Sequence, residues 1–319
     1  MNQFTTYNKD QESFRLKTHI QIAAVRYHIL SELDIFLKEK EIAFFLTEDM
    51  IAQDPTPSSE YLQVYTTIFA TEQLPYTEKG NVIDYDDENV TIWHDHESEY
   101  RNHYAGFIQP DSPLYAQSRY TITGDHEAHL EIYYLTESNL WYNSNIRIWN
   151  LLHLEDTLLS AGAFILHCCY TMYQDQAILF TAPSGTGKTT QATLWKENYG
   201  SEIINGDKAV LMKWHGTWYV FGYPYHGSAP ECENKHFPIK AISIVRQSPE
   251  DKIATEGTLR TISDIYNETT VNYWKEESVD KIMELISDLY QNVTILKQYC
   301  TMNPSAAHTL HDYIYKENL

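Results

Sequence analysis

The sequence predicts a mixed α/β (α+β) protein made of two unlike domains. Residues 1–150 hold short runs rich in Tyr, Thr and Ile that are broken by polar turns, a pattern typical of β-strands. Near Ile148 the pattern changes, and segments of strand type begin to alternate with segments of helix type. A glycine-rich loop stands between one such strand and helix. We therefore expect a β-rich N-terminal domain over residues 1–150 and an α/β domain over residues 151–319.

The N-terminal domain is expected to be an antiparallel sheet that binds a substrate or partner. Its predicted strands combine alternating polarity with β-branched or aromatic side chains. They lie at 19–25, 61–69, 90–93, 120–123 and 129–135. Polar stretches at 53–60 and 76–81 are expected to be loops.

The C-terminal domain is expected to alternate between helices and strands. The predicted helices lie at 151–164, 189–199, 279–290 and from Pro304 onward, with Gly200 ending the second and Asn303 capping the last. The predicted strands lie at 165–170, 177–180, 202–205, 209–214, 219–221, 239–245 and 293–296. Turns are expected at 174–175 and 215–216. Apolar positions at 282, 285, 286 and 289 share one face of their helix.

The charge of the chain limits its partners. The 319 residues include 23 basic and 44 acidic side chains, which gives a net charge of −21. A chain this acidic repels nucleic acid, because such binding depends on Lys and Arg neutralising phosphates. No apolar run reaches membrane-spanning length, the N-terminus lacks a signal-peptide core, and the four cysteines show no disulfide spacing. We expect a cytoplasmic protein with no nucleic-acid or membrane partner.

The glycine-rich segment at 182–190 fits the phosphate-binding pattern [AG]-x-x-x-x-G-K-[ST]. The expected nucleotide-binding residues are Pro183, Ser184, Gly185, Thr186, Gly187, Lys188, Thr189 and Thr190. In such a loop backbone N–H groups surround the phosphates, Lys188 reaches the outer ones, and Thr189 holds Mg²⁺. The flanking strand and helix favour this interpretation over a glycine-rich turn without a ligand. ATP, or another nucleoside triphosphate, and Mg²⁺ are the predicted cofactors.

Two further residues stand at informative distances from the loop. His167 lies fifteen positions before Ala182, on the strand expected to pair with the one that leads into the loop. Asp207 lies nineteen positions after Lys188, at the end of a predicted strand where a Mg²⁺ ligand or a base is expected. A buried core histidine and a turn aspartate are the alternatives. Together with the loop, the two residues favour a catalytic site formed by His167, Lys188 and Asp207.

The arrangement His167-x14-Ala182-x-Ser-Gly-x-Gly-Lys-Thr189, followed by Asp207, resembles HPr kinase/phosphorylase and ATP-dependent phosphoenolpyruvate carboxykinase. These two families share a nucleotide-binding core. The loop itself is most similar to that of the carboxykinase. The order of elements, with a strand at 293–300 and a helix after it, is more similar to small kinases related to HPr kinase. Several of those kinases are encoded in bacterial peptide-modification gene clusters. The resemblance covers about residues 150–319.

The resemblance implies an HPr-kinase/carboxykinase-like P-loop domain with a defined set of roles. Lys188 and Thr189 would bind phosphate and metal, Asp207 would be a metal ligand or a base, and His167 would lie at the metal and the transferred phosphoryl group. Related kinases tend to associate, so a homo-oligomer is also implied. The chain departs from both families in one respect. They carry paired Asp at this strand end, whereas here Gly206 precedes Asp207, so one carboxylate role is missing or moved.

A loop after the next hairpin is expected near the acceptor substrate. It resembles a Gly-x-Pro-aromatic-x-Gly loop of the small kinases. Its candidate acceptor-binding residues are Tyr225, His226, Gly227 and Ser228. Arg246, at the end of a predicted strand, is a candidate partner for a substrate anion. An ordinary tight connection and a solvated arginine are the respective alternatives.

Two other groups resemble metal sites and are discounted. The acidic run at 84–88 lacks the Gly and the final Glu of a calcium loop. The His-Asp-His segment at 94–96, with His103 nearby, lacks a third ligand at a convincing spacing. Cys168 and Cys169 are expected to point to opposite faces of a strand as buried apolar side chains.

We interpret the sequence as that of an ATP- and Mg²⁺-dependent kinase of the HPr-kinase-like group. It would transfer the γ-phosphoryl group to a hydroxyl acceptor, which is serine, another small molecule, a peptide or a protein Ser/Thr. A carboxykinase is disfavoured, because residues 151–319 contain only two arginines, Arg246 and Arg260, to grip an acidic substrate. A nucleotide-binding regulator without turnover stays open because Gly206 replaces a second carboxylate, and so does a phosphohydrolase.

Overall fold

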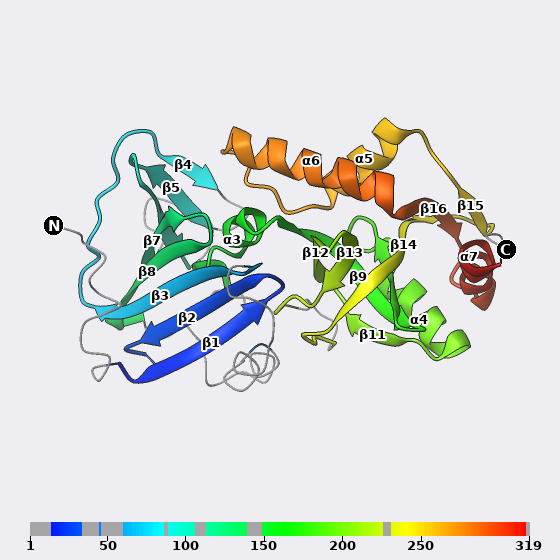
Figure 1. The fold of residues 1–319 in the computed structure, drawn as a ribbon, viewed down its shortest axis with the longest axis horizontal. Coiled ribbons are helices and arrows are strands. Elements are labelled where there is room, and N and C mark those ends of the chain that lie inside the picture. Colours follow the sequence, from blue (N-terminus) through cyan, green and yellow to red (C-terminus); the bar gives the residue numbers. More distant parts are fainter. Residues whose placement is uncertain are drawn as a thin grey trace. The chain divides into compact units, whose positions relative to one another are not determined.

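The structure is a computed structural model that describes residues 14–33, 45, 60–85, 89–105, 113–138, 149–225 and 231–316 (Figure 1). The chain divides into two compact units, Met1–Thr157 and Leu158–Leu319. In the described part of each unit eight strands form a mixed β-sheet, so the mixed α/β class predicted from the sequence is confirmed. Among the described residues, no helix is both long enough and apolar enough to cross a membrane. The loop predicted at 53–60 lies outside the described residues except for its last position.

The first unit is an open sheet with the strand order β1-β2-β3-β8-β7-β6-β5-β4. Its strands are β1 (Leu16–Ile22), β2 (Val25–Ser31), β3 (Leu62–Thr71), β4 (Ile83–Tyr85), β5 (Val90–His94), β6 (Ser98–Tyr104), β7 (Leu114–Gly124) and β8 (Glu127–Leu135), and a short 3-10 turn follows at Thr136–Ser138. β3 runs parallel to both of its neighbours, β2 and β8. The prediction of an antiparallel sheet is therefore wrong at β3.

The direction of β3 follows from the chain that leads to it. A tight turn joins antiparallel neighbours, whereas a parallel pair needs a crossover of about a dozen residues or more. β2 ends at Ser31 and β3 begins at Leu62, so the connection is long enough for a crossover. Alternating polarity within a strand does not report its direction, and the sequence pattern therefore could not distinguish the two arrangements.

The two faces of this sheet differ in character. On one face Ile20, Ile29, Val64 and Ile132 are wholly buried. On the other, His19, His28, Tyr65 and His129 pair in register across four adjacent strands. Their ring centroids lie 5.0–5.4 Å apart. This alternation between apolar and aromatic or polar side chains is the one that marked these segments as strands.

The second unit contains the predicted loop. Its strands are β9 (Ala163–Tyr173), β10 (Gln176–Thr181), β11 (Glu202–Asn205), β12 (Lys208–Trp214), β13 (Thr217–Phe221), β14 (His236–Gln247), β15 (Lys252–Ala254) and β16 (Thr294–Cys300). Its helices are α4 (Lys188–Tyr199), α5 (Thr258–Asn267), α6 (Glu276–Asn292) and α7 (Pro304–Tyr315), while α3 (Leu154–Ser160) spans the division between the units. The strand order is β10-β9-β12-β13-β14-β16-β15, with β11 on β9.

β14 pairs with three other strands of this sheet, β13, β10 and β16. Its first residues pair antiparallel with β13, and its later residues pair in parallel with both β10 and β16. Because β10 also pairs with β9, the strands β9, β10, β14, β13 and β12 form a closed cycle. The carboxyl ends of the parallel strands β10, β14 and β16 therefore meet at one edge, the position at which open α/β sheets bind ligands.

Helices pack on both faces of this sheet (Figure 1). Ile265 of α5 and Ile282, Ile286 and Leu289 of α6 belong to one core, and Leu285 packs against it, as the predicted amphipathic face requires. The other core is formed with α4 and α7. Cys168 belongs to the first core and Cys169 to the second. The prediction that these neighbouring side chains point to opposite faces is confirmed.

The ends of two helices differ from the predictions. The helix expected at 151–164 is shorter, because the chain adopts a positive φ of 77° at Gly162 and strand β9 begins at Ala163. Gly200 ends α4 as predicted, in a left-handed conformation with its N–H bonded to the Lys196 carbonyl oxygen. Asn303 precedes α7, but its side chain makes no capping hydrogen bond.

Candidate phosphate-binding site

The glycine-rich loop connects β10 to α4 at the carboxyl edge of the sheet. Gly185 and Gly187 have φ values of 77° and 113°, which side chains with a Cβ rarely adopt. The Thr186 N–H donates to the Pro183 carbonyl oxygen at 3.2 Å and closes the turn. Pro183, Ser184, Gly185 and Thr189 are exposed. The loop is thus a tight, solvent-facing turn that leads directly into a helix N-terminus, where backbone N–H groups favour anions.

Lys188 occupies the first position of α4 and is only 8% exposed. Its Nζ donates to the carbonyl oxygen of Ala182 at 2.8 Å, so the side chain folds back over its own loop. Burial lowers the pKa of Lys188, and the negative charges of Glu268 and Asp207 partly oppose that shift. A phosphate placed at the loop would offer the ammonium group a stronger, charged acceptor than a peptide carbonyl.

A glutamine from a different strand supports the loop. Gln247 is the last residue of β14. Its Nε2 donates to the carbonyl oxygen of Thr186 at 3.3 Å and to the carbonyl oxygen of Gly185 at 3.5 Å. This contact links the end of β14 to the backbone of the loop. Gln247 could not be predicted from the sequence, because only the parallel pairing of β10 and β14 brings it to the loop.

His167, Asp207 and Glu268 form a group of ionisable side chains in the same unit, and all three lie partly open to solvent. His167 Nδ1 lies 3.0 Å from Glu268 Oε2, and His167 Nε2 lies 3.7 Å from Asp207 Oδ1. The exposed fractions of these side chains are 27% for His167, 26% for Asp207 and 11% for Glu268. The histidine is therefore flanked by two carboxylates, one on each ring nitrogen.

Backbone pairing places His167 and Asp207 together. β9 and β12 are antiparallel neighbours, with His167 opposite Lys208, and the Cys168 N–H donates to the Asp207 carbonyl oxygen at 2.9 Å. The turn that carries Asp207 is held by Asn205, whose Oδ1 accepts from the backbone N–H groups of Asp207 and Lys208 at 2.9 and 3.2 Å. The structure thus brings together two residues that the sequence places forty positions apart.

Glu268 was not a candidate in the sequence. It caps the C-terminal end of α5, and its carboxylate contacts a histidine 101 residues earlier in the chain. No motif or spacing marks it, because the contact depends on how α5 packs beside β9. The negative charge of its carboxylate also opposes the lowering of the Lys188 pKa by burial.

Thr189 and Asp207 carry oxygen donors of the type that Mg²⁺ prefers. Thr189 is exposed at the start of α4, and Asp207 offers a partly exposed carboxylate. A hydroxyl and a carboxylate are hard oxygen ligands, and Mg²⁺ sites in phosphate-binding loops use such a pair together with phosphate oxygens and water. The residues present therefore fit the predicted cofactor.

The predicted acceptor residues are only partly described. The carbonyl oxygen of Tyr225 accepts from Asn205 Nδ2 at 3.2 Å, so the loop starts beside the turn that carries Asp207. His226, Gly227 and Ser228 lie outside the described residues. Arg246 lies at the end of β14, where its Nη2 donates to Asp264 Oδ1 at 3.0 Å. Its guanidinium therefore already has an anionic partner within the protein.

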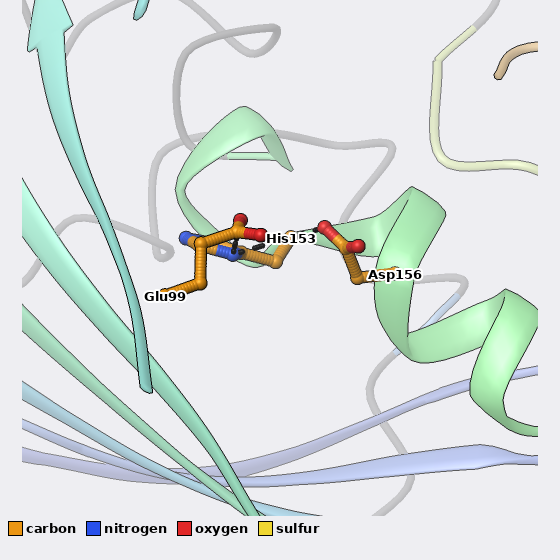
Figure 2. Close-up of side chains that lie close together, drawn as sticks. All are labelled: Glu99, His153 and Asp156. Carbon is orange, nitrogen blue, oxygen red and sulfur yellow. Dashed lines mark ion pairs between the residues drawn. The ribbon is translucent and has the colours of Figure 1, made fainter. Parts of the chain in front are cut away.

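A second ionisable group lies in the first unit. Among the described residues, one set of three potential metal ligands has its donor atoms within 4.8 Å of one another: Glu99, His153 and Asp156 (Figure 2). All three are buried. Arg101, also buried, donates to Glu99 Oε1 at 2.7 Å and to Asp156 Oδ2. A cation already faces these carboxylates, so we interpret the group as a buried ion-pair network.

The histidines that the sequence analysis discounted as metal ligands have other partners. His94 Nε2 lies 3.1 Å from Glu99 Oε2, and the buried His103 Nε2 lies 2.8 Å from the Ser118 hydroxyl. The last three residues of the acidic run at 84–88 lie outside the described residues. None of the described residues of these two groups belongs to the set shown in Figure 2.

We compared the chain with models of known protein families and with curated proteins, and neither comparison finds a match.

Proposed function

We propose that the protein is an ATP- and Mg²⁺-dependent kinase that transfers the γ-phosphoryl group of a nucleotide to a hydroxyl acceptor, on a core of the HPr-kinase type. One observation carries this proposal. A tight glycine-rich loop with a lysine at its end lies in the same unit as a histidine that contacts two carboxylates, and the negative charges of Asp207 and Glu268 oppose the lowering of the Lys188 pKa by burial. Phosphoryl transfer requires little more than positioned charges and a proton acceptor.

In this mechanism the loop binds the phosphates. Backbone N–H groups at 185–187 and the positive end of α4 hold the nonbridging oxygens. Lys188 leaves the Ala182 carbonyl oxygen and neutralises charge on the outer phosphates. Thr189 and Asp207 would hold Mg²⁺, which screens the phosphate charge when it is bound.

The acceptor hydroxyl attacks the γ-phosphorus on the side opposite the leaving ADP. A new bond forms between the acceptor oxygen and phosphorus, and the bond from phosphorus to the bridging oxygen of ADP breaks. The hydroxyl proton passes to a base, for which His167 and Asp207 are the candidates. Both have exposed surface through which an acceptor can approach.

The test is a measurement of ADP release with and without acceptors. We expect little ADP release with water alone and a marked increase with free serine, a Ser-containing peptide or a protein substrate. Phosphorus NMR of the product would identify a phosphate ester. Equal ADP release with and without every acceptor would indicate a phosphohydrolase. Nucleotide binding without any ADP release would indicate a regulator.

A further inference from the structure

The contact between Glu268 and His167 bears on which ring nitrogen of the histidine carries a hydrogen. An ionised carboxylate accepts hydrogen bonds and cannot donate them. The 3.0 Å contact between Glu268 Oε2 and His167 Nδ1 therefore favours a hydrogen on Nδ1. In the neutral ring, the lone pair must then lie on Nε2, the nitrogen that faces Asp207 at 3.7 Å.

The carboxylate is held in this place by the backbone. The His167 N–H donates to the Glu268 carbonyl oxygen at 2.8 Å, and the Thr270 N–H donates to the Ile165 carbonyl oxygen at 3.0 Å. Leu166 and Thr269 form a β-bridge between these two bonds. The segment after α5 is thus paired along β9, which keeps the backbone of Glu268 beside His167. The Glu268 side chain is 11% exposed, less than the 27% of His167.

We propose that Glu268 is a positioning residue for the proposed kinase reaction, and that it presents Nε2 of His167 as the atom that accepts the proton of the acceptor hydroxyl. This inference rests on the proposed function. As the acceptor oxygen bonds to phosphorus and ADP departs with the electrons of the broken bond, the hydroxyl proton moves to Nε2. The resulting imidazolium lies between two negative charges, those of Glu268 and Asp207.

This assignment separates the roles of the two carboxylates. Asp207 remains available as a Mg²⁺ ligand, while Glu268 orients the base from the more buried side. Gly206 stands where the resembled families carry a second aspartate. In the arrangement that we propose, Glu268 at the end of α5 supplies the second carboxylate of the site.

The first experiment measures turnover of Glu268→Gln with saturating and limiting nucleotide. Glutamine retains the size of the side chain but can donate its amide hydrogens to Nδ1 and favour the wrong tautomer. We expect kcat to fall by about a hundredfold to ten-thousandfold, the usual contribution of a positioned base, while KM for ATP changes little. Glu268→Asp should recover part of the loss. Glu277→Gln, at an exposed position of α6, is the matched control and should keep full activity.

The second experiment needs no turnover. Nitrogen-15 NMR of the full-length protein without nucleotide reports the tautomer of each histidine, and His167→Gln identifies the His167 signals. We expect the hydrogen on Nδ1 in the wild type and a changed tautomer ratio in Glu268→Gln. A wild-type hydrogen on Nε2, or no change in both tautomer and kcat, would overturn the positioning role.

The two experiments also separate this inference from the proposed function. If the wild type releases no ADP with any acceptor, the kinase reaction is wrong and the base role of His167 is wrong with it. The NMR result still decides whether Glu268 sets the His167 tautomer. If ADP release is normal in Glu268→Gln, the kinase proposal stands and the positioning inference is overturned.

Discussion

Lys188 makes one contact that stabilises the loop, and we propose a second that stabilises the transferred phosphoryl group. Lys188→Ala should lower kcat/KM by about a hundredfold to a thousandfold, as expected when one donor to transition-state charge is lost. The lost bond to the Ala182 carbonyl oxygen should cost only about 1 kcal/mol of unfolding free energy. Calorimetric titration with ATP and Mg²⁺, together with thermal unfolding, measures both effects.

Lys196→Ala is the control for this substitution, since Lys196 is exposed near the end of the same helix. It removes the same charge from α4 and should leave nucleotide affinity unchanged. Undiminished affinity and turnover in Lys188→Ala itself would show that the loop does not bind phosphate.

Asp207 is the carboxylate that we assign to Mg²⁺. Asp207→Asn keeps the size of the side chain but removes the charge that binds the ion. We expect turnover to fall by about a hundredfold or more. Because the proton is assigned to His167, a high Mg²⁺ concentration should restore much of the loss. The measurement is a Mg²⁺ titration of initial rates.

Asp280→Asn, at an exposed position on α6, serves as the control for Asp207→Asn. It should reproduce the wild-type Mg²⁺ dependence. A loss in Asp207→Asn that no concentration of Mg²⁺ restores would assign the proton to Asp207 in place of His167. Full activity at low Mg²⁺ would move the catalytic carboxylate elsewhere.

At the scale of elements, the junction between the loop and α4 depends on a glycine. Gly187 has a φ of 113°, and no atom lies within 4 Å of the position that a Cβ would occupy. The penalty for Gly187→Ala is therefore conformational strain of about 1–3 kcal/mol, without a clash. We expect a lower melting temperature and nucleotide affinity weakened about tenfold or more, since about 1.4 kcal/mol corresponds to tenfold.

Gly257→Ala is the matched substitution for the experiment at Gly187. Gly257 precedes α5 with a φ of −62° and also has open space around it, so alanine fits there without strain. This variant should keep or slightly raise the melting temperature. Equal behaviour of the two variants would mean that the loop conformation at Gly187 is not required.

The elements that the sequence predicts well are those defined by local pattern. The strand, loop and helix around residues 177–199 follow from an apolar run, a phosphate-loop motif and a glycine stop, all within a short segment. The turn at 174–175 was also predictable, and both residues adopt positive φ values. Local signals of this kind do not depend on the rest of the fold.

Features set by tertiary packing could not be predicted in this way. The direction of β3, the support of the loop by Gln247 and the contact of Glu268 with His167 each join segments that are distant in the sequence. The alternation of apolar and polar side chains along a strand reports which face is buried. It does not report which strand lies beside it or whether the two run parallel. The loop, His167 and Asp207 could therefore be identified from the sequence alone. Gln247 and Glu268, which contact the loop and His167, could not.

At the scale of the whole molecule, the first unit contains a titratable group that should set its stability in acid. Burial, with the nearby charge of Arg101, lowers the pKa of His103 to about 3 from an ordinary value of 6.5. In the unfolded chain His103 takes up a proton below pH 6.5, whereas in the folded unit it stays neutral until about pH 3. The contribution of neutral His103 to the free energy of unfolding is thus complete above pH 6.5 and is lost progressively as the pH falls toward 3.

Urea unfolding at a series of pH values tests this expectation, with hydrogen exchange in β6 and β7 reporting on the first unit. His103→Gln should flatten the fall in unfolding free energy between pH 6.5 and 4. His126→Gln, in the exposed turn between β7 and β8, should retain the wild-type slope. A slope that is the same in all three proteins would assign the acid sensitivity to other groups.

The closed cycle of strands that includes β14 also constrains the order in which the strands pair during folding. The β9–β10 and β12–β13 pairs join strands that are close in the chain, and they can form early in folding. β14 must then close the cycle by a parallel pairing with β10, which lies far earlier in the sequence. A growing chain that has not yet reached residue 236 contains every residue of the phosphate loop but lacks the strand that supports it. The nucleotide binding that we propose should therefore arise only after synthesis has passed β14.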